Sequence, residues 1–335
     1  MSNGSPRIDL SERIAGYYFR CVTPRSLPSV AQLPGRVVVL DIAFSNLKSK
    51  KAKNYPTITH RFVDKLGARL AAWVDHHDTV YRDDFSDDAR FILATKAEHG
   101  ACPEMITPAL VEEVGPVDTI LCHNDFDGLA SAAKWMLGGQ DPYPGCDQDA
   151  YAIDTRLGTP SNEATRIDHA LRARWRDTEI RREIVQLMIS GLQDKARWAL
   201  IDEAALEFAA SAAEAKRLAK GYEVRDGLAY LRLEEGAERC AYDKTELLLE
   251  GQRHAVVAVV SRGDTVTFAA RFDSGINFVK LLGLSGGMPT LVSLPRGYER
   301  RGLSVLRRRG IGRRLESTSE PPAARNSMPT EEEDR

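Results

Sequence analysis

Short apolar runs that each end in acidic or imidazole side chains dominate the first half of the chain. Their length is typical of strands buried on both faces, the pattern of a parallel sheet. The runs span residues 37–40, 71–74, 117–122 and 150–153. Apolar positions at helical spacing occupy residues 57–70, 129–138, 162–176 and 178–192. Because strands and helices alternate, the sequence predicts an α/β fold built on a parallel sheet.

The pattern changes after residue 200. Strong helix formers fill residues 204–220, and the segments 223–234, 254–260 and 265–271 then have the composition and alternation of sheet strands. We therefore expect a first domain over residues 1–200, a linker helix over 201–221 and a smaller α/β domain over 222–305. Residues 306–335 contain too little apolar surface to fold and are expected to form a disordered tail.

Composition narrows the class of protein. A chain of 335 residues with 43% apolar residues can bury a large core, while a net charge of only −2 provides no bulk field for a polyanion or a membrane. The five cysteines are isolated, which disfavours a disulfide framework and a thiolate zinc site. No apolar run approaches the roughly 20 residues needed to cross a bilayer. These features indicate a cytoplasmic protein with no membrane partner.

The polar clusters at the predicted strand ends carry the chemistry. Asp41 follows the first run, Asp75-His76-His77 the second, and residues 123–128 (HNDFDG) the third. The carboxyl ends of parallel strands meet at one edge of a sheet, so these groups are expected to converge there and to hold two divalent cations. Each cluster alone has a simpler reading: Asp125 could cap the following helix, and a single histidine is commonly a satisfied core residue.

These motifs, the DHH triplet and the His-x-Asp-x-Asp-Gly stretch, resemble those of the DHH phosphoesterase family. That family includes RecJ-like exonucleases, oligoribonucleases and cyclic-dinucleotide phosphodiesterases. The resemblance implies a parallel-sheet domain with two Mn²⁺ ions, Mg²⁺ being the alternative, joined by a linker helix to a small substrate-binding domain of the DHHA1 type.

The resemblance also implies roles for individual residues. His123 and Asp125 correspond to ligands of one ion, and His76 and Asp127 to ligands of the other, with Asp41 as the bridging carboxylate. His77 corresponds to the histidine that contacts the phosphate, and Asp75 is expected to fix an imidazole tautomer. The last acidic ligand is expected at Asp194, and Asp154 is the rival for the position of Asp41 or Asp194.

Two features depart from the family pattern. The His-x-Asp-x-Asp-Gly stretch follows Asp41 and the DHH triplet instead of preceding them, so the motif order looks permuted. The small domain has Gly286-Gly287-Met288 where the family often has a Gly-Gly-His loop, and methionine offers no hydrogen-bond donor. Backbone N–H groups of Gly286 and Gly287 can still bind an anion, and Arg271 is expected either to assist them or to form an ordinary surface ion pair.

The predicted function is Mn²⁺-dependent hydrolysis of phosphodiester or phosphomonoester bonds, with a hydroxide between two ions as the nucleophile. Short oligonucleotides, cyclic dinucleotides and nucleotides are the expected substrates. The arginine-rich stretch 296–314 either binds single-stranded nucleic acid or is a solvated segment. The alternative function is a non-catalytic nucleotide or nucleic-acid binder on the same scaffold. The oligomeric state stays open, a dimer being one option.

Overall fold

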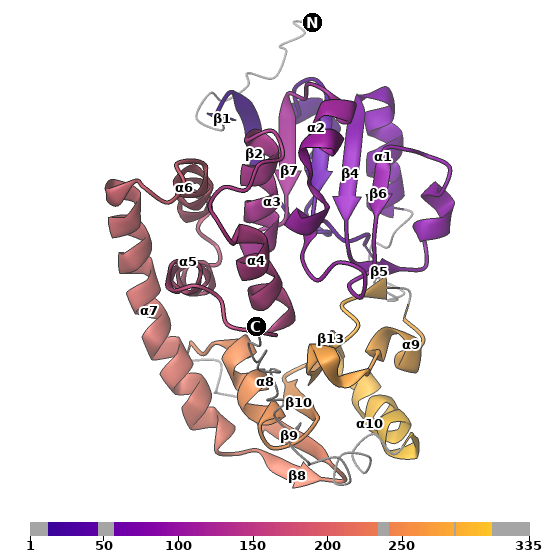
Figure 1. Cartoon of the computed structure of the whole chain (residues 1–335). Coiled ribbons are helices and arrows are strands. Elements are labelled where there is room, and N and C mark those ends of the chain that lie inside the picture. Colours follow the sequence, from indigo (N-terminus) through magenta and orange to yellow (C-terminus); the bar gives the residue numbers. More distant parts are fainter. Residues whose placement is uncertain (1–12, 46–56, 234–240, 285, 310–335) are drawn as a thin grey trace, which may run out of the picture.

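The computed structural model describes residues 13–45, 57–233, 241–284 and 286–309. Two sheets lie at opposite ends of the molecule, and the long helix α7 runs down one side from the first to the second (Figure 1). The strands β5 (Asp78–Thr79) and β12 (Gly286–Gly287) form a separate two-stranded ribbon. This ribbon joins the segment that follows β4 of the first sheet to the glycine-rich segment that precedes β13 of the second. The helix α7 (Lys195–Ala219) covers most of the range predicted for the linker helix, 201–221, and begins earlier.

The first sheet has six strands, and all of its pairings except that of the edge strand β1 are parallel. From edge to edge, the strands are β1 (Arg13–Ile14), β2 (Tyr17–Cys21), β7 (Thr119–Cys122), β3 (Val37–Leu40), β4 (Leu70–Asp75) and β6 (Phe91–Leu93). The strands predicted at 37–40, 71–74 and 117–122 are thus confirmed, and they are neighbours at the centre of the sheet. In Figure 1 the arrowheads of β4 and β6 point toward the second sheet.

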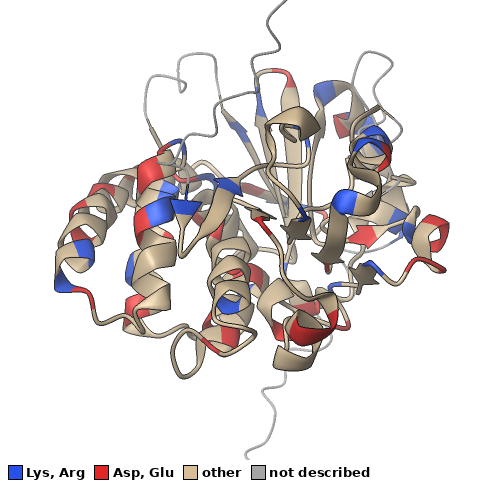
Figure 2. Cartoon of the chain, turned by 90° about the horizontal axis from the view of Figure 1, so that it is seen from above, with Lys and Arg blue, Asp and Glu red and all other residues tan. Residues whose placement is uncertain are grey.

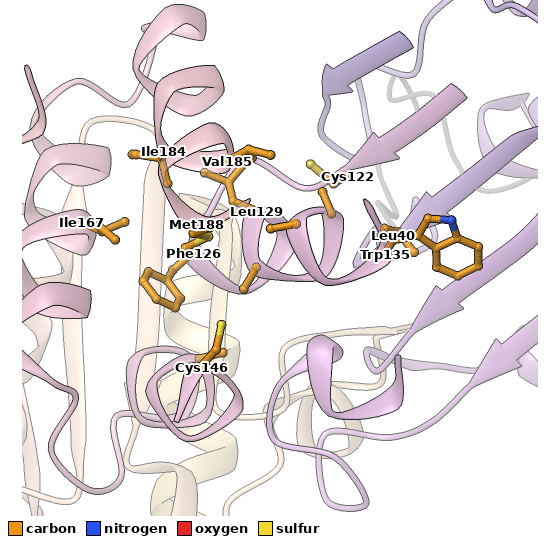
Figure 3. Close-up of a cluster of buried hydrophobic side chains, with 14 of the residues drawn as sticks. Leu40, Cys122, Phe126, Leu129, Trp135, Cys146, Ile167, Ile184, Val185 and Met188 are labelled. Carbon is orange, nitrogen blue, oxygen red and sulfur yellow. The ribbon is translucent and has the colours of Figure 1, made fainter. Parts of the chain in front are cut away.

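Burial on both faces explains why these strands lack polar alternation. Val38 and Leu40 pack into one core with the helices, whereas Val37 and Val39 pack into a second core with α1. The helices around the sheet are α1 (Thr59–Leu66), α2 (Pro108–Val114), α3 (Phe126–Met136), α4 (Cys146–Thr155), α5 (Asn162–Ala173), α6 (Thr178–Ile189) and α7 (Lys195–Ala219). Figure 3 shows side chains of α3 between those of the strands and those of α6.

The predicted strand at 150–153 is wrong, because these residues lie inside α4. Cys146, Ala150 and Ile153 are buried, and their spacing of three to four positions is the helical period. A run of four apolar residues cannot by itself distinguish a strand from the buried side of a helix. Asp154 consequently approaches the sheet from a helix.

The second sheet mixes parallel and antiparallel pairs. Its order is β13 (Leu291–Pro295), β11 (Thr265–Ala270), β10 (Val257–Arg262), β9 (Leu228–Leu233) and β8 (Glu223–Arg225). Its helices are α8 (Lys244–Gln252), α9 (Phe278–Leu282) and α10 (Glu299–Arg308). The stretch 223–234 forms two strands because Asp226 and Gly227, both with positive φ, make a hairpin turn.

The C-terminal boundary differs from the expectation. Helix α10 continues to Arg308, past residue 305, and buries Leu306 against the second sheet. The rest of the expected tail and residues 310–314 of the arginine-rich stretch lie outside the described residues. Lysines and arginines are interspersed with acidic residues along the helices (Figure 2), in keeping with the small net charge. Within the described segments, no helix combines the length and the apolar character that a membrane span requires.

Candidate metal centre

Three central strands deliver the predicted polar clusters to one edge of the first sheet. Asp41 follows β3, His76 and His77 follow β4, and His123 follows β7. The strand ends are fixed beyond the strands themselves: the Asp41 N–H donates to the carbonyl of Val74 at 2.8 Å, and the His123 N–H donates to the carbonyl of Leu40 at 3.2 Å. The sheet therefore sets the spacing of the clusters.

Asp41 lies at the centre of this edge. Its side chain is 1% exposed, and neither carboxylate oxygen has a hydrogen-bond partner. Its backbone has a φ of 57°, a left-handed conformation that is uncommon for residues other than glycine. Burial, followed by the charges of Asp127 and Asp125, raises the pKa of Asp41 well above its ordinary value. A buried carboxylate without donors, held in a strained conformation, is suited to binding a cation.

The first candidate ligand group consists of Asp41, His123 and Asp125. Nδ1 of His123 lies 2.7 Å from Oδ2 of Asp125 and 3.7 Å from Oδ2 of Asp41. Ligand atoms bound to one Mn²⁺-sized ion lie about 3 Å apart, as follows from bond lengths of about 2.1–2.3 Å. Burial lowers the pKa of His123, but the charge of Asp125 and then of Asp41 outweigh it and raise that pKa to about 10. The group thus attracts positive charge.

The turn at the start of α3 positions Asp125 and Asp127. Asp125 is the N-cap of α3, where its Oδ1 accepts from the Gly128 N–H at 3.4 Å while its Oδ2 faces His123. Asp125 can therefore cap the helix with Oδ1 and offer Oδ2 to a metal ion at the same time. A Cβ on Gly128 would lie 2.7 Å from the backbone oxygen of His123, so only glycine allows this turn.

The second candidate group consists of His76, Asp127 and Asp154. Nε2 of His76 lies 3.3 Å from Asp127 Oδ2, 3.8 Å from Asp154 Oδ2 and 3.2 Å from Asp41 Oδ1. Nδ1 of His76 faces the carbonyl oxygen of His99 at 2.9 Å, which directs Nε2 toward the carboxylates. Asp41 contacts both groups, as expected of a bridging carboxylate.

The protonation preferences of this second group also favour positive charge. Burial raises the pKa of Asp127, but its hydrogen bond with His76 and the charge of Lys96 outweigh burial and hold that pKa well below its ordinary value. For His76, burial and Lys96 lower the pKa, and the carboxylates of Asp127 and Asp41, 3.3 and 3.2 Å from Nε2, raise it to about 10. The carboxylates of Asp41 and Asp127 therefore stabilise positive charge at Nε2 of His76. That charge can be a proton, the ammonium of Lys96 or a metal ion.

His77 and Asp75 form a separate pair. Nδ1 of His77 lies 2.8 Å from Oδ1 of Asp75, so Asp75 orients His77 and not His76. Burial raises the pKa of Asp75, but the neighbouring His77 has the larger effect, and the pKa of Asp75 is lowered. For His77, burial outweighs the charge of Asp75 and lowers the pKa of the imidazole. At neutral pH the pair is a carboxylate with a neutral imidazole whose Nε2 is unprotonated. Nδ1 of His77 also lies 3.7 Å from Oδ1 of Asp41, and Asp41, His76 and His77 form a third candidate ligand group, in which the hydrogen bond to Asp75 competes for Nδ1.

Asp154 and Asp194 lie in different surroundings. Asp154 belongs to the second ligand group, whereas Asp194 is the N-cap of α7, where its Oδ1 accepts from the N–H groups of Ala196 and Arg197. Asp194 also pairs with the Arg197 side chain at 3.0 Å and belongs to none of the ligand groups among the described residues. The structure thus places Asp154, and not Asp194, beside the other predicted ligands, while an oxygen of Asp194 accepts from the first turn of α7.

Lys96 is the residue that sequence reasoning missed. It lies three positions beyond β6, and its side chain is 1% exposed. Nζ lies 2.9 Å from Nε2 of His76 and forms an ion pair with Asp154. A run of only three apolar residues, Phe91–Leu93, precedes it, and this run is too short to be recognised as a strand. The same strand-end position that marked Asp41 and His76 would have marked Lys96.

A cavity of about 1020 Å³ opens beside the ligand groups and extends to the second sheet. Asp125, Asp127 and Asp154 line it at the metal end. Arg271 and Met288 line it on the side of the second sheet, so the substituted loop position does face the predicted binding region. Arg271 is 61% exposed and forms an ion pair with Asp273 at 2.7 Å. It thus forms the surface ion pair that was one prediction and also lines the cavity, which is compatible with the other prediction, a contact with the substrate.

The predicted glycine loop lies next to the DHH segment. Gly287 pairs with Asp78 and Gly286 with Thr79 in the β5–β12 ribbon, directly after His77. The ribbon therefore brings the backbone of the glycine-rich segment close to His77. This location agrees with a substrate role for Gly286 and Gly287, which stays a prediction.

Together, the fold and the site define an α/β protein whose parallel sheet presents a carboxylate–imidazole cluster at its carboxyl edge. No protein-family model matches the chain, and no curated protein matches it. The chain is similar to exonuclease RecJ bound to manganese, with a TM-score of 0.40 and 12% identity over 82% of this chain and 75% of that one.

Two further solved structures are similar. The pGpG-specific phosphodiesterase PggH from Vibrio cholerae has a TM-score of 0.39 and 11% identity over 83% of this chain and 99% of that one. RecJ from Thermus thermophilus in complex with Mn²⁺ has a TM-score of 0.42 and 12% identity over 82% of this chain and 44% of that one. RecJ-like exonucleases belong to the family that the sequence resembles. At such low TM-scores, the functional conclusion depends on the side chains of this chain.

Proposed function

We propose that the protein is a divalent-metal-dependent phosphoesterase. One observation supports this proposal above all: acidic and imidazole groups from three separate strand ends and one helix meet around the buried, unpartnered carboxylate of Asp41. A structural role does not explain such a cluster, because like charges brought together without cations destabilise the fold. A cluster of this kind is retained where it binds cations.

The donor set fits the proposed metal. Carboxylate oxygens and imidazole nitrogens without thiolates favour Mn²⁺ or Mg²⁺, and Cys122, although adjacent to His123, is buried in the sheet. Asp41, His123 and Asp125 would hold one ion, and His76, Asp127 and Asp154 offer the second of the two expected positions. A bound ion activates water as a nucleophile and neutralises charge on the phosphoryl group.

His77 is proposed to contact the phosphate of the substrate. Its Nδ1 is engaged by Asp75 at 2.8 Å, and 17% of its side chain is exposed. Asp75 thus orients the ring and leaves Nε2 to face the reacting group, where it can accept a hydrogen bond, or donate one once it is protonated. Asp75 acts as a positioning residue through His77.

The cavity supports a nucleotide or short oligonucleotide as substrate. Its lining includes the guanidinium groups of Arg156 and Arg271 and the aromatic rings of Phe272 and Trp175. Trp175 is 59% exposed, and the guanidinium of Arg176 lies over its ring at 4.4 Å, so a base could stack on the opposite face of the ring. Arginines that neutralise phosphates, beside rings that stack on bases, suit substrates with one or two bases, including linear and cyclic dinucleotides.

Hydrolysis assays test this proposal directly. Metal-free protein is supplied with Mn²⁺ and incubated with di- to pentanucleotides, cyclic dinucleotides and 3′,5′-bisphosphorylated adenosine. We expect Mn²⁺-dependent release of mononucleotide or phosphate, abolished by Asp127→Asn and retained by Asp194→Asn, which preserves the cap of α7. Intact substrates across the whole panel would reject the enzyme assignment.

The second candidate function is non-catalytic binding of nucleotides. Met288 on the cavity and the buried Lys96 within the ligand cluster favour it, because both differ from what a hydrolytic centre of this kind is expected to contain. A nucleotide-induced rise in melting temperature, without product under any metal condition, would support binding over catalysis.

A further inference from the structure

Lys96 places a fixed positive charge inside the candidate metal centre. Its ammonium is buried, pairs with Asp154 and lies 2.9 Å from Nε2 of His76. Its charge also acts on Asp127 and on Asp75, lowering the pKa of both carboxyl groups. Lys96 thus contacts or influences every member of the second ligand group.

The two ligand groups differ in this respect. The ammonium of Lys96 contacts His76 and Asp154, whereas Asp41, His123 and Asp125 have no contact with a lysine or arginine side chain among the described residues. Because Nδ1 of His76 faces the His99 carbonyl, Nε2 is the nitrogen that faces the cluster, and Lys96 contacts it. An ammonium and a metal ion cannot share the same nitrogen and the same Asp154 oxygen.

We propose that Lys96 permanently takes the place of one of the two cations, so that the chain binds a single divalent ion, at Asp41, His123 and Asp125. This inference depends on the proposed metal-dependent function and specifies its cofactor content. A tethered ammonium neutralises Asp127 and Asp154 as an ion would, but it supplies one charge instead of two.

The burial of Lys96 makes this arrangement stable. An ion that entered the second group would displace the ammonium from Asp154 and His76 and leave a buried charge without partners, which strongly destabilises a folded protein. The lysine follows the edge strand β6, whose backbone is tied to β4, and the Ala94 N–H donates to the carbonyl of Asp75 at 2.9 Å. The sheet therefore holds Lys96 in the cluster in the same way as it holds the ligands.

Metal stoichiometry tests the inference without reference to activity. The full chain is stripped with a chelator, titrated with MnCl₂ by calorimetry, and its bound manganese is measured by mass spectrometry after removal of free ions. We expect one equivalent for the wild type and two for Lys96→Met, which keeps the length of the side chain and removes its charge. Lys96→Gln serves the same purpose if the methionine variant does not fold.

Lys134→Met is the matched control. Lys134 is also buried, and its Nζ lies 2.8 Å from Asp141 and 2.6 Å from Asp147, at the other end of α3 from the ligands. Removing this charge should leave the stoichiometry at one. Electron paramagnetic resonance adds an independent readout, because two Mn²⁺ ions about 4 Å apart are magnetically coupled, whereas a single bound ion is not.

Each outcome decides. Two equivalents in the wild type, or one equivalent in both Lys96 variants, would overturn the inference. One equivalent in the wild type without hydrolysis of any substrate would reject the proposed activity and leave the role of Lys96 intact. Two equivalents in the wild type together with hydrolysis would reject the role of Lys96 and support the proposed activity. If no manganese binds, both the activity and the role of Lys96 are rejected.

Discussion

Replacing Asp41 by asparagine should stabilise the metal-free protein and weaken its response to Mn²⁺. Asparagine has nearly the shape of aspartate and is one of the residues best tolerated at positive φ, so the backbone at φ 57° is preserved. The substitution therefore removes the charge of Asp41 and little else. It separates the electrostatic contribution of this carboxylate from its packing.

The size of the effect follows from the environment of Asp41. An unpartnered buried polar group costs about 1–3 kcal/mol and a charged one more, while His76, 3.2 Å from Oδ1, offsets part of this cost. We expect a gain of about 2 kcal/mol in the free energy of unfolding at neutral pH. For a chain of this length, this raises the melting temperature by about 3 °C.

The sign of the pH dependence is fixed by the raised pKa of Asp41. Its value in the folded protein lies well above the ordinary 3.8, so the folded protein holds the proton more tightly than the unfolded chain does. Below about pH 3.8 the carboxyl is protonated in both states and costs nothing. The advantage of Asp41→Asn should therefore be absent in acid and grow as pH rises toward neutrality.

Thermal unfolding with chelator and with Mn²⁺ measures both effects. At about 100 times its dissociation constant, Mn²⁺ should stabilise the wild type by about 2.7 kcal/mol, so the order of stability of the wild type and Asp41→Asn should reverse. Asp194→Asn, a cap substitution at α7, should follow the wild type in both conditions. A metal-free Asp41→Asn less stable than the wild type, or an equal Mn²⁺ shift in both proteins, would refute the role of Asp41.

Three further results are expected. Gly128→Ala should lower the free energy of unfolding by about 1–3 kcal/mol and weaken Mn²⁺ binding, because its Cβ would lie 2.7 Å from the His123 oxygen; an unchanged melting temperature would contradict the turn geometry. Arg156 lines the cavity, so Arg156→Ala should raise KM for a dinucleotide about tenfold, equivalent to about 1.4 kcal/mol, with a smaller effect on kcat. The control Arg174→Ala removes an ion pair with Glu207 and should leave KM unchanged. Calorimetry at several pH values should show that the affinity for Mn²⁺ rises about tenfold per pH unit for each proton released, up to about pH 10. The reason is that His123 must lose its proton to bind the ion. An affinity that does not change between pH 7 and 9 would exclude His123 as a ligand.

The sequence by itself determined the centre of the first sheet. The runs at 37–40, 71–74 and 117–122 are apolar at every or nearly every position, which is typical of strands buried on both faces, and β3, β4 and β7 are the result. Since parallel strands end at one edge, the residues that follow these runs, Asp41, His76 and His123, had to converge. This step from sequence to site needed no knowledge of side-chain contacts.

The tertiary structure alone decided which distant residues complete the site. Asp154 and Asp194 are equivalent by composition, yet one lies at the end of a helix that packs beside the sheet edge and the other satisfies the first turn of α7. Lys96 follows a strand too short to leave a hydrophobic signature. Local patterns encode burial and backbone conformation, whereas the partners of a charged side chain depend on packing between elements far apart in the sequence, and that information appears only once the chain is folded.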